Sequence, residues 1–292
     1  PILESSGLLA GEDFRLAFSP ETVLPGNILA ELKSNDRIVG GIDDASTAAG
    51  AALYESLTDG EIHETDATTA EMAKLTQNTF RDINIAFANE LTKIARENAV
   101  DSGELIELAN THPRVSVHHP GPGVGGHCIP IDPWFLIEDS EHGELIETAR
   151  QVNESMTEYV IELLRAELGT LQDRTIGVLG IAYKGNVSDA RESPGLRVVN
   201  HLRQDNGTTV LINDPHINDG NFESVPLDEL LEQVDGIIVT TDHDEYATYT
   251  PPQEFSSEPA VLQDGSGKII VDTKDILDAE TWKNCGYRLI QL

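Results

Sequence analysis

The sequence predicts an α/β protein in which a helical segment lies between two strand-containing parts. Three observations support this fold class. Apolar runs alternate with helical stretches over the last third of the chain. The centre carries a long pattern of apolar residues at three- and four-residue steps, which is typical of helices. The first part combines short strand-like runs with one helical run. We therefore expect three domains, over residues 1–65, 66–170 and 171–292.

In the first domain, residues 14–18 and 37–39 are expected to form short strands around a loop at residues 20–26 that contains proline and glycine. Residues 45–57 are expected to form a helix, although Gly50 weakens the helical pattern. These are pieces of an α/β domain without room for its first half. Because the chain also does not start with methionine, we expect it to be a fragment of a longer gene product.

The longest helical pattern runs from residue 68 to about residue 98 and contains neither glycine nor proline. Its large apolar residues form one stripe, and Asp82 is expected at the surface beside it. The members of the stripe are Met72, Leu75, Phe80, Ile83, Phe87, Leu91 and Ile94. Further helices are expected at residues 103–111 and 143–168, with a loop at residues 113–133. The middle domain is therefore predicted to be all-helical.

The last domain contains four apolar runs that we expect to be strands, at residues 175–180, 208–214, 235–241 and 268–273. Helical stretches at residues 193–203 and 227–233 alternate with them. Such alternation predicts a parallel, doubly wound sheet. Ligands of these sheets lie at the carboxyl ends of the strands, here near Gly180, Asp214, Thr241 and Asp272. The domain is predicted to bind a nucleotide.

The composition limits the partners and the compartment. The net charge is −32, and only seven of the 19 basic residues are lysines, so binding to nucleic acid is disfavoured. No apolar run approaches the ~18 residues that span a bilayer, and we expect no membrane partner. Two cysteines exclude a disulfide framework and favour a reducing cytoplasm. Dispersed acids fit a halophilic protein, whose self-repulsion is screened by concentrated salt.

The segment GPGVGGHCIPIDPWF, residues 121–135, is the most informative one for function. Its Cys128 is either a buried loop cysteine or a nucleophile for which the glycines leave room. The glycines formally match the G-x-G-x-x-G fingerprint of dinucleotide-binding loops, but Pro122 lacks an amide, and Pro130 and Pro133 are expected to block a following helix. We expect no metal site, because the cysteines and histidines show no zinc-type spacing.

Several cationic residues have two readings each. Lys74, Asn78 and Arg81 share one helix face, which is either solvated or part of a site for an anionic substrate. His112 and Arg114 either stabilise the end of a helix or contact a phosphate or sugar. Lys184, Arg191 and Lys274 follow predicted strands and are either ordinary loop charges or phosphate ligands.

Five blocks of sequence occur in the order found in one known family: SPETVLPGN, AEMAKLTQNTFRDINIAFANEL, THPRV, GPGVGGHCIPIDPWFL and AYKGNVSDARESP. With them the chain resembles the nucleotide-sugar 6-dehydrogenases of the UDP-glucose and GDP-mannose dehydrogenase superfamily. It is most similar to the branch that acts on UDP-N-acetyl-D-mannosamine. The resemblance implies a remnant of an NAD-binding Rossmann domain, a central helical dimerisation domain with the cysteine loop, and a C-terminal Rossmann-like domain that binds the UDP-sugar.

The resemblance also implies an activity: oxidation of a sugar C6 alcohol to a carboxylate in two hydride steps with NAD⁺. Cys128 would be the nucleophile that forms a thiohemiacetal and then a thioester. Lys74, helped by Asn78, would be the acid/base residue or oxyanion stabiliser, and Asp132 and Glu21 would serve the hydrolytic water. Substrate contacts would come from Thr22, Val23, Arg81, His112, Arg114, Gly125, Tyr183, Lys184 and Lys274. Arg191 would reach the phosphates of NAD⁺.

The family resemblance further implies a homodimer formed through the long central helix, in which a partner subunit supplies His112 and Arg114. Two departures from the pattern are visible. Thr22 stands where this branch usually has an arginine, and from the place of Pro1 in the family pattern we expect the amino-terminal half with the main NAD⁺ site to be missing. UDP-N-acetylglucosamine or UDP-glucose as substrate stays open. So does a non-catalytic module that binds a UDP-sugar or dimerises.

Overall fold

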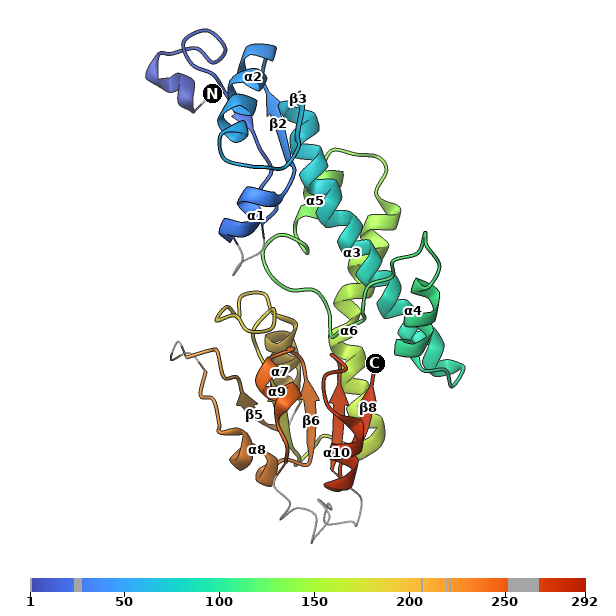
Figure 1. Ribbon diagram of the computed structural model, residues 1–292. Helices are drawn as coiled ribbons and strands as arrows, with labels where there is room; N and C mark the ends of the chain where they lie inside the picture. Colours follow the sequence, from blue (N-terminus) through green and yellow to red (C-terminus); the bar gives the residue numbers. More distant parts are fainter. Residues whose placement is uncertain (1, 24–27, 206, 219, 221, 252–267) are drawn as a thin grey trace. The chain divides into compact units, whose positions relative to one another are not determined.

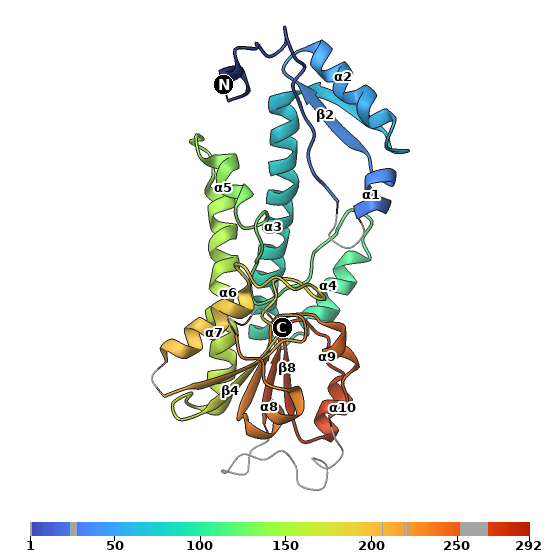
Figure 2. The same cartoon turned by 90° about the vertical axis from the view of Figure 1, so that its left-hand side faces the viewer.

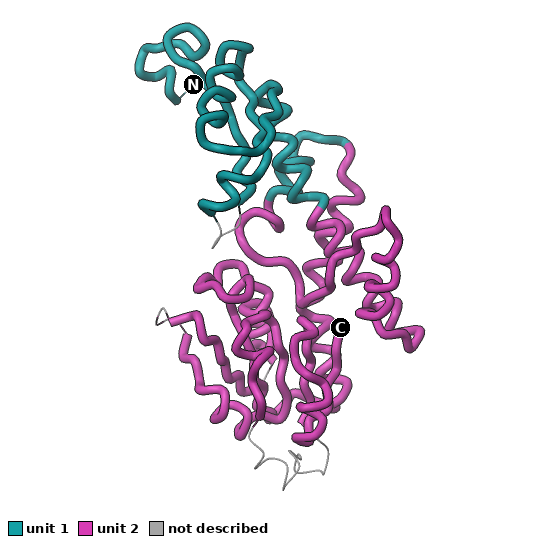
Figure 3. The backbone as a smooth tube through the Cα atoms, viewed as in Figure 1, with its two compact units in different colours: residues 1–80, 132–141 teal, residues 81–131, 142–292 magenta. Residues whose placement is uncertain are grey.

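The computed structural model describes residues 2–23, 28–205, 207–218, 220, 222–251 and 268–292 (Figure 1). Residues 24–26 of the expected loop therefore lie outside the described residues. The chain divides into two compact units (Figure 3). Unit 1 consists of Pro1–Phe80 and Asp132–Glu141, and unit 2 consists of Arg81–Ile131 and His142–Leu292.

Unit 1 contains a three-stranded sheet in the order β1-β2-β3, in which β1 is antiparallel to β2 and β2 is parallel to β3. Along the chain its elements are η1 (Leu3–Ser6), β1 (Ala17–Phe18), α1 (Ile28–Ser34), β2 (Arg37–Gly41), α2 (Asp44–Glu55) and β3 (Ile62–Asp66). Helix α2 starts after Asp43, whose carboxylate accepts the Ser46 N–H. Gly50 lets α2 approach β2, since a Cβ there would lie 2.8 Å from Val39 Cγ1.

The first domain differs from the expectation in three places. The first strand is shorter than residues 14–18, and α1 and β3 were not expected. Strand β3 reads IHETD, and its alternation of polar residues gives little apolar signal.

Helix α3 (Ala67–Glu97) is the long helix that the sequence predicts. Its apolar stripe, however, is not a core face. Four members remain about half exposed in the single chain: Met72, Phe80, Phe87 and Ile94, at 52, 63, 50 and 49%. The side chains that α3 buries are small or polar, namely Ala70, Thr79, Asp82, Ala86, Ala88, Asn89, Thr92 and Ala95. The expectation of a surface position for Asp82 is wrong, because its carboxylate pairs with the buried Arg150 at 2.7 Å.

The remaining helices of the middle segment are α4 (Ser102–Asn110), α5 (Asp132–Ile137) and α6 (Glu144–Leu168). Helix α4 begins after Asp101, whose carboxylate accepts the Glu104 N–H. Helix α5 corrects the expectation that the prolines block a helix after Cys128. Pro133 is the second residue of α5. In the first turn of a helix a proline is tolerated, because the N–H that it lacks has no partner there.

Unit 2 ends in a parallel sheet in the order β5-β4-β6-β7-β8, which confirms the predicted doubly wound fold. Helices α6 and α7 cover one face, and α8, α9 and α10 cover the other (Figure 2). The elements after α6 are β4 (Thr175–Leu179), α7 (Pro194–Gln204), β5 (Thr209–Asn213), α8 (Leu227–Gln233), β6 (Gly236–Val239), α9 (Asp244–Thr248), β7 (Ile269–Asp272), α10 (Ala279–Asn284) and β8 (Arg288–Gln291). The three short elements α9, α10 and β8 were not expected.

Two apolar cores hold this sheet between its helices. One joins α6 and α7 to the sheet through side chains such as Met156, Leu164 and Val198. The other joins α8 to α10 through side chains such as Leu230 and Trp282. Among the described residues, no helix is long and apolar enough to cross a membrane.

Candidate functional site

In unit 2, the segment from Gly121 to Cys128, here called the Cys loop, packs on the loop that follows β4. A Cβ at Gly125 would lie 2.7 Å from Pro194 Cδ and 2.8 Å from the Glu192 carbonyl oxygen. Gly126 has a φ of +86°, and a Cβ there would lie 3.2 Å from the ring of Tyr183. Only glycine suits these two positions, so that the chain can pass close to Tyr183 and α7.

Cys128 itself is exposed, and it is a free thiol. Its carbonyl oxygen accepts the Ile131 N–H at 3.0 Å, which closes a turn just before α5. Of the two readings of Cys128, the buried one is wrong for this chain. The other free cysteine, Cys285, is buried in the core beside Trp282, which agrees with its expected packing role.

Cationic and aromatic groups from two strand ends lie near the Cys loop. Tyr183 and Lys184 follow β4, and Lys274 follows β7. A Cβ at Gly121 would lie 3.7 Å from Lys274 Nζ. Tyr183 and Lys274 are half-buried and Lys184 is exposed. Unit 2 thus brings the Cys loop close to Tyr183 at Gly126 and close to Lys274 at Gly121, although these residues are far apart in the sequence.

The loop after β4 owes its shape to Asp214, at the carboxyl end of β5. Asp214 Oδ2 accepts the N–H groups of Ile181 and Ala182 at 2.6 and 3.0 Å. Its Oδ1 accepts the N–H groups of His216 and Ile217. Burial opposes the charge of this carboxylate, but these hydrogen bonds and one from His243 outweigh it and lower the pKa of Asp214 to about 2.

His243, His216 and Glu245 lie beside Asp214, with possible ligand atoms within 4.8 Å of one another. They do not suit a metal ion. His243 Nδ1 accepts the Asn186 N–H at 3.0 Å, so the proton of the neutral ring is on Nε2, 3.2 Å from Asp214 Oδ2. A ligating nitrogen needs a free lone pair, and His243 has none left. His243 instead ties Asn186, and with it the loop after β4, to the end of β6.

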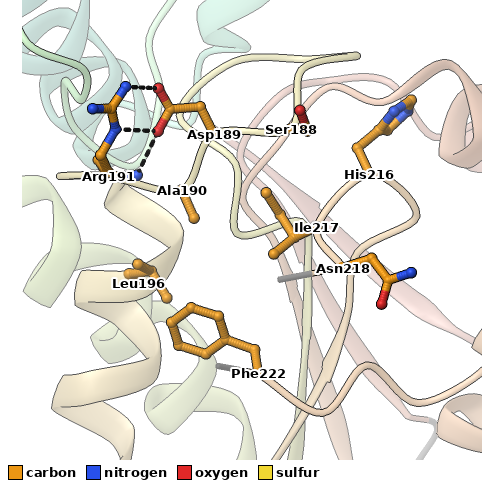
Figure 4. Close-up of a pocket in the computed structure, with 9 residues that line it drawn as sticks. All are labelled: Ser188, Asp189, Ala190, Arg191, Leu196, His216, Ile217, Asn218 and Phe222. Carbon is orange, nitrogen blue, oxygen red and sulfur yellow. Dashed lines mark hydrogen bonds and ion pairs between the residues drawn. The ribbon is translucent and has the colours of Figure 1, made fainter. Parts of the chain in front are cut away.

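A cavity of about 740 Å³ lies beyond the carboxyl ends of β4 and β5 (Figure 4). Leu196, Ile217 and Phe222 form its apolar part. Arg191 lines it, and its guanidinium donates two hydrogen bonds to Asp189, from Nε at 2.9 Å and from Nη2 at 2.7 Å, beside a third from its backbone N–H. The bonds from Arg191 lower the pKa of Asp189 to about 2. Because two of the five guanidinium N–H groups are used, the others are available to an anion.

Unit 1 holds the remaining residues to which a catalytic role was assigned. Asn78, on α3, donates from Nδ2 to Asp132 Oδ2 at 2.5 Å, across 54 positions of sequence. Lys74 is half-buried one turn earlier on α3. Glu21 accepts the Val23 N–H at 2.8 Å and lies 3.9 Å from the buried guanidinium of Arg37. Thr22, which lies between Glu21 and Val23 in the sequence, is half-buried. Since Lys74 and Cys128 belong to different units, their meeting at one cavity stays a prediction.

Three cationic residues of unit 2 have neighbours of their own. Arg114 Nη2 lies 3.4 Å from His112 Nε2, and both side chains are exposed after α4. Among the described residues, no hydrogen bond or ion pair joins this couple to Cys128 or Lys274. Arg81 is exposed and close enough to His118 to influence its charge. The pKa of His118 is lowered, mainly by burial of the imidazole and secondly by the positive charge of Arg81. Within the described part of the chain, the structure therefore shows no direct bond between His112 or Arg114 and the two residues Cys128 and Lys274.

The sequence indicated the exposed and half-buried residues of the site, but it did not indicate that the residues at the strand ends hold the loops in place. Asp214, Thr241 and Asp272 were expected near a ligand because they end strands. All three are buried, at 3, 1 and 0% exposure. Thr241 donates to the Ala182 carbonyl, and Asp272 accepts the N–H groups of Lys274, Ile276 and Leu277. An aspartate directly after an apolar strand was the available signal, and it indicates a loop anchor as readily as a ligand.

Fold and site together define an α/β protein of the class that binds ligands at the carboxyl ends of a doubly wound sheet. Two family models give the particular family. The central domain of the UDP-glucose/GDP-mannose dehydrogenase family matches residues 68–155, and the UDP binding domain of that family matches residues 177–279.

Known proteins agree with this match. The chain is 44% identical over 281 residues to UDP-N-acetyl-D-mannosamine dehydrogenase of Methanocaldococcus jannaschii, covering 95% of this chain and 64% of that protein. It is 44% identical over 240 residues to NDP-N-acetyl-D-galactosaminuronic acid dehydrogenase of Ralstonia solanacearum, covering 80% and 57%. A solved structure of UDP-D-ManNAc dehydrogenase from Pyrococcus horikoshii superposes with a TM-score of 0.86 at 38% identity, covering 99% of this chain and 68% of that one.

The chain belongs to the UDP-glucose/GDP-mannose dehydrogenase family, as the sequence resemblance predicted. It spans about 64% of the length of the first of these curated relatives.

The role of Asp214 in holding the loop after β4 can be tested by the pH dependence of stability. Because the pKa of Asp214 lies below its ordinary value of 3.8, the charged carboxylate stabilises the fold at neutral pH, and this contribution disappears as the pH falls from about 4 to about 2. We expect Asp214→Asn to lower the free energy of unfolding at pH 7 by about 2 kcal/mol or more. We also expect it to flatten the loss of stability between pH 4 and 2. Urea titrations at one KCl concentration measure both.

The matched control is Asp244→Asn, which removes an exposed carboxylate from the first turn of α9. We expect this variant to change stability by no more than about 0.5 kcal/mol. Equal losses in the two variants would contradict the anchoring role of Asp214.

Proposed function

We propose that the protein to which this chain belongs oxidises the C6 alcohol of UDP-N-acetyl-D-mannosamine to the carboxylate, in two NAD⁺-dependent steps. The observation that carries the proposal is the packing of the Cys loop on Tyr183 and beside Lys274. It supports a site in which the exposed thiol of Cys128 and the cationic groups at the strand ends of a nucleotide-type sheet serve one ligand. The names of the relatives supply the substrate class.

In the proposed reaction, the Cys128 thiolate attacks the C6 aldehyde that the first oxidation produces. A sulfur–carbon bond forms, and the carbonyl electron pair moves to oxygen to give a thiohemiacetal. Loss of a hydride from C6 then leaves a thioester, which water hydrolyses to the carboxylate and the free thiol. When bound, NAD⁺ accepts the hydride of each oxidation. We assign its phosphates to Arg191, whose remaining N–H groups fit an anion.

The other residues divide between chemistry and binding. Lys74 is proposed to stabilise negative charge on the C6 oxygen and to transfer its proton, and Asn78 helps it. Asp132, which Asn78 orients, is proposed to activate the hydrolytic water together with Glu21. The sugar and the diphosphate are assigned to Thr22, Val23, Arg81, His112, Arg114, Gly125, Tyr183, Lys184 and Lys274.

A direct test is calorimetry of UDP binding to this chain, with and without NAD⁺. We expect UDP to bind and NAD⁺ to add nothing, because the proposed contacts to UDP lie within the described residues, whereas only Arg191 is assigned to NAD⁺. Lys274→Ala should weaken UDP binding about tenfold, since it removes a charged contact to phosphate. Lys283→Ala, on α10, is the matched control. No binding of UDP would contradict the assignment.

The reaction is tested on the full-length gene product by NADH formation with a panel of UDP-sugars. We expect turnover of UDP-N-acetyl-D-mannosamine that Cys128→Ser abolishes and Cys285→Ser leaves intact. Preference for UDP-N-acetylglucosamine or UDP-glucose would change the substrate but keep the class of enzyme. Turnover of none of them would leave a non-catalytic UDP-sugar-binding module.

We further propose that two copies of the chain pair through α3. The four exposed residues Met72, Phe80, Phe87 and Ile94 recur after eight, seven and seven positions and so share one side of the helix. A monomer rarely leaves such an apolar row in water. In such a dimer, His112 and Arg114 of one subunit are expected to serve the site of the other.

We expect Phe87→Glu to convert the dimer into a monomer, because the row would then bury a charge. Gln77→Glu adds the same charge to an exposed position of α3 outside the row and should leave the dimer intact. Sedimentation velocity distinguishes the two species. A monomeric wild-type chain, or a dimer unaffected by Phe87→Glu, would refute this interface.

We also propose that the protein functions in a cytoplasm of concentrated salt. With a net charge of −32, its compact state is opposed by self-repulsion that only a high ionic strength screens. We expect the midpoint of thermal unfolding to rise steeply with KCl, and the chain to unfold below roughly molar KCl. Circular dichroism at a series of KCl concentrations measures this, and full stability in dilute buffer would contradict it.

A further inference from the structure

Residues 115–121 lead into the Cys loop without belonging to a helix or strand, and three asparagines bind their main chain. Asn84 donates to the Ser116 carbonyl and accepts the His118 N–H, at 2.7 and 2.9 Å. Asn110 donates to the Val117 carbonyl and accepts the Val117 N–H. Asn89, fully buried, accepts the Gly121 N–H at 2.8 Å. Asparagine suits this task because its amide both donates and accepts.

From Gly121 onward, each of four successive residues contacts a buried or half-buried group. After the bond from Gly121 to Asn89, Thr157 donates to the Pro122 carbonyl at 3.3 Å. A Cβ at Gly123 would lie 3.0 Å from the Asn153 carbonyl oxygen. Arg197 donates to the Val124 carbonyl at 3.1 Å. The backbone four residues before Cys128 is therefore fixed against α3, α6 and α7.

Asn89 differs from the other two asparagines, because its amide continues into a chain of buried side chains. Asn89 Nδ2 donates to Asn153 Oδ1 at 2.9 Å. Asn153 Nδ2 donates to Asp82 Oδ1 at 2.9 Å and to the Asp82 carbonyl at 3.0 Å. Asp82 Oδ1 also accepts from Arg150 Nη1 at 2.7 Å. The four side chains are 0 to 2% exposed.

The ion pair determines the direction of every bond in this chain. A carboxylate only accepts, so Asn153 must turn its NH₂ group toward Asp82 and its oxygen toward Asn89. Asn89 must then turn its NH₂ group toward Asn153 and its oxygen toward the Gly121 N–H. If the amide of Asn153 or Asn89 flipped, its oxygen would face another oxygen and its NH₂ group would face another N–H donor. Buried polar groups on both sides of that amide would then lose their hydrogen-bond partners.

We propose that Asn89 is a positioning residue for Cys128, and that the Asp82–Arg150 pair, acting through Asn153, fixes the orientation of its amide. The inference rests on the proposed function only in taking Cys128 as the nucleophile. We call the four side chains Arg150, Asp82, Asn153 and Asn89 the relay. The relay fixes the position of Gly121, and the constrained residues after Gly121 in turn fix the position of the Cys128 thiol. None of the four side chains touches the substrate in this proposal.

The test uses three variants of positions on α3. Asn89→Ala removes the amide. Asn89→Asp keeps the size and still accepts the Gly121 N–H, but it puts an acceptor against Asn153 Oδ1. Thr92→Val is the matched control, because Thr92 is equally buried and its hydroxyl, among the described parts of the chain, donates within the helix to the Ala88 carbonyl. All are compared with the wild type in salt that keeps the chain folded.

Amide exchange and chemical shifts measured by NMR give the first readout, which needs no substrate. In Asn89→Ala and Asn89→Asp we expect the Gly121 amide to exchange about tenfold faster or more, as for the loss of one buried hydrogen bond. The amides of Val117 and His118, which Asn110 and Asn84 hold, should change less than about twofold. The Cys128 cross-peak should shift in both variants and stay in place in Thr92→Val.

Turnover by the full-length protein gives the second readout. We expect both Asn89 variants to lower kcat about tenfold or more with KM changed less than about threefold, because a misplaced nucleophile affects the chemical step more than binding. Equal acceleration of all three amides would mean general destabilisation and would overturn the proposal. So would a wild-type-like Asn89→Asp, or an unchanged kcat. If the wild type turns over no UDP-sugar, the function fails, while a localised effect at Gly121 and Cys128 still supports the relay.

Discussion

The Cys loop must satisfy its backbone without the help of a helix or a strand, and much of unit 2 is arranged around that requirement. Buried N–H and C=O groups need partners, and here side chains provide them. Asn89, Thr157 and Arg197 bind the loop from three different helices. The glycines of the loop complete the arrangement, since a side chain at Gly125 would collide with Pro194 of α7, and Gly126 has a positive φ and lies close to Tyr183.

The scarcity of cations makes their location informative. The chain has 19 basic residues against 51 acids, and on a solvated surface a single cation is easily replaced. Arg150 is nevertheless buried and Arg197 half-buried, both serving the Cys loop and its support. A buried ion pair adds little net stability compared with apolar packing, but it gives a fixed polarity that apolar packing cannot. In this chain the ion pair sets the orientation of the Asn153 and Asn89 amides, and Asn89 in turn accepts the Gly121 N–H.

The sequence allowed the outline of the fold to be predicted, because strands buried on both faces are continuous apolar runs. Strands β4, β6 and β7 were found for that reason, and the edge strand β5, although only partly buried, has a similarly apolar sequence. The apolar stripe on α3 was harder to interpret. Helical periodicity shows that one side of a helix is apolar, but it does not show what packs on that side. Asp82 was misplaced because a charged residue on a helix is normally solvated, and Arg150, its partner, lies 68 positions away. Asn78 and Asp132 were both selected, but only the fold brings them within 2.5 Å.

The strand ends also explain how a very acidic protein can offer a site to an anionic ligand. Carboxylates at the carboxyl ends of the strands would repel a diphosphate if their charge were free. Asp214 accepts four backbone N–H groups and one imidazole N–H, Asp242 accepts the Gly185 N–H, and Asp272 accepts three N–H groups. Each carboxylate thus faces the dipoles of a loop, and the loop in turn presents Tyr183, Lys184 or Lys274. The acids hold the loops from within, which leaves Lys184 and Lys274 available to the proposed anionic ligand.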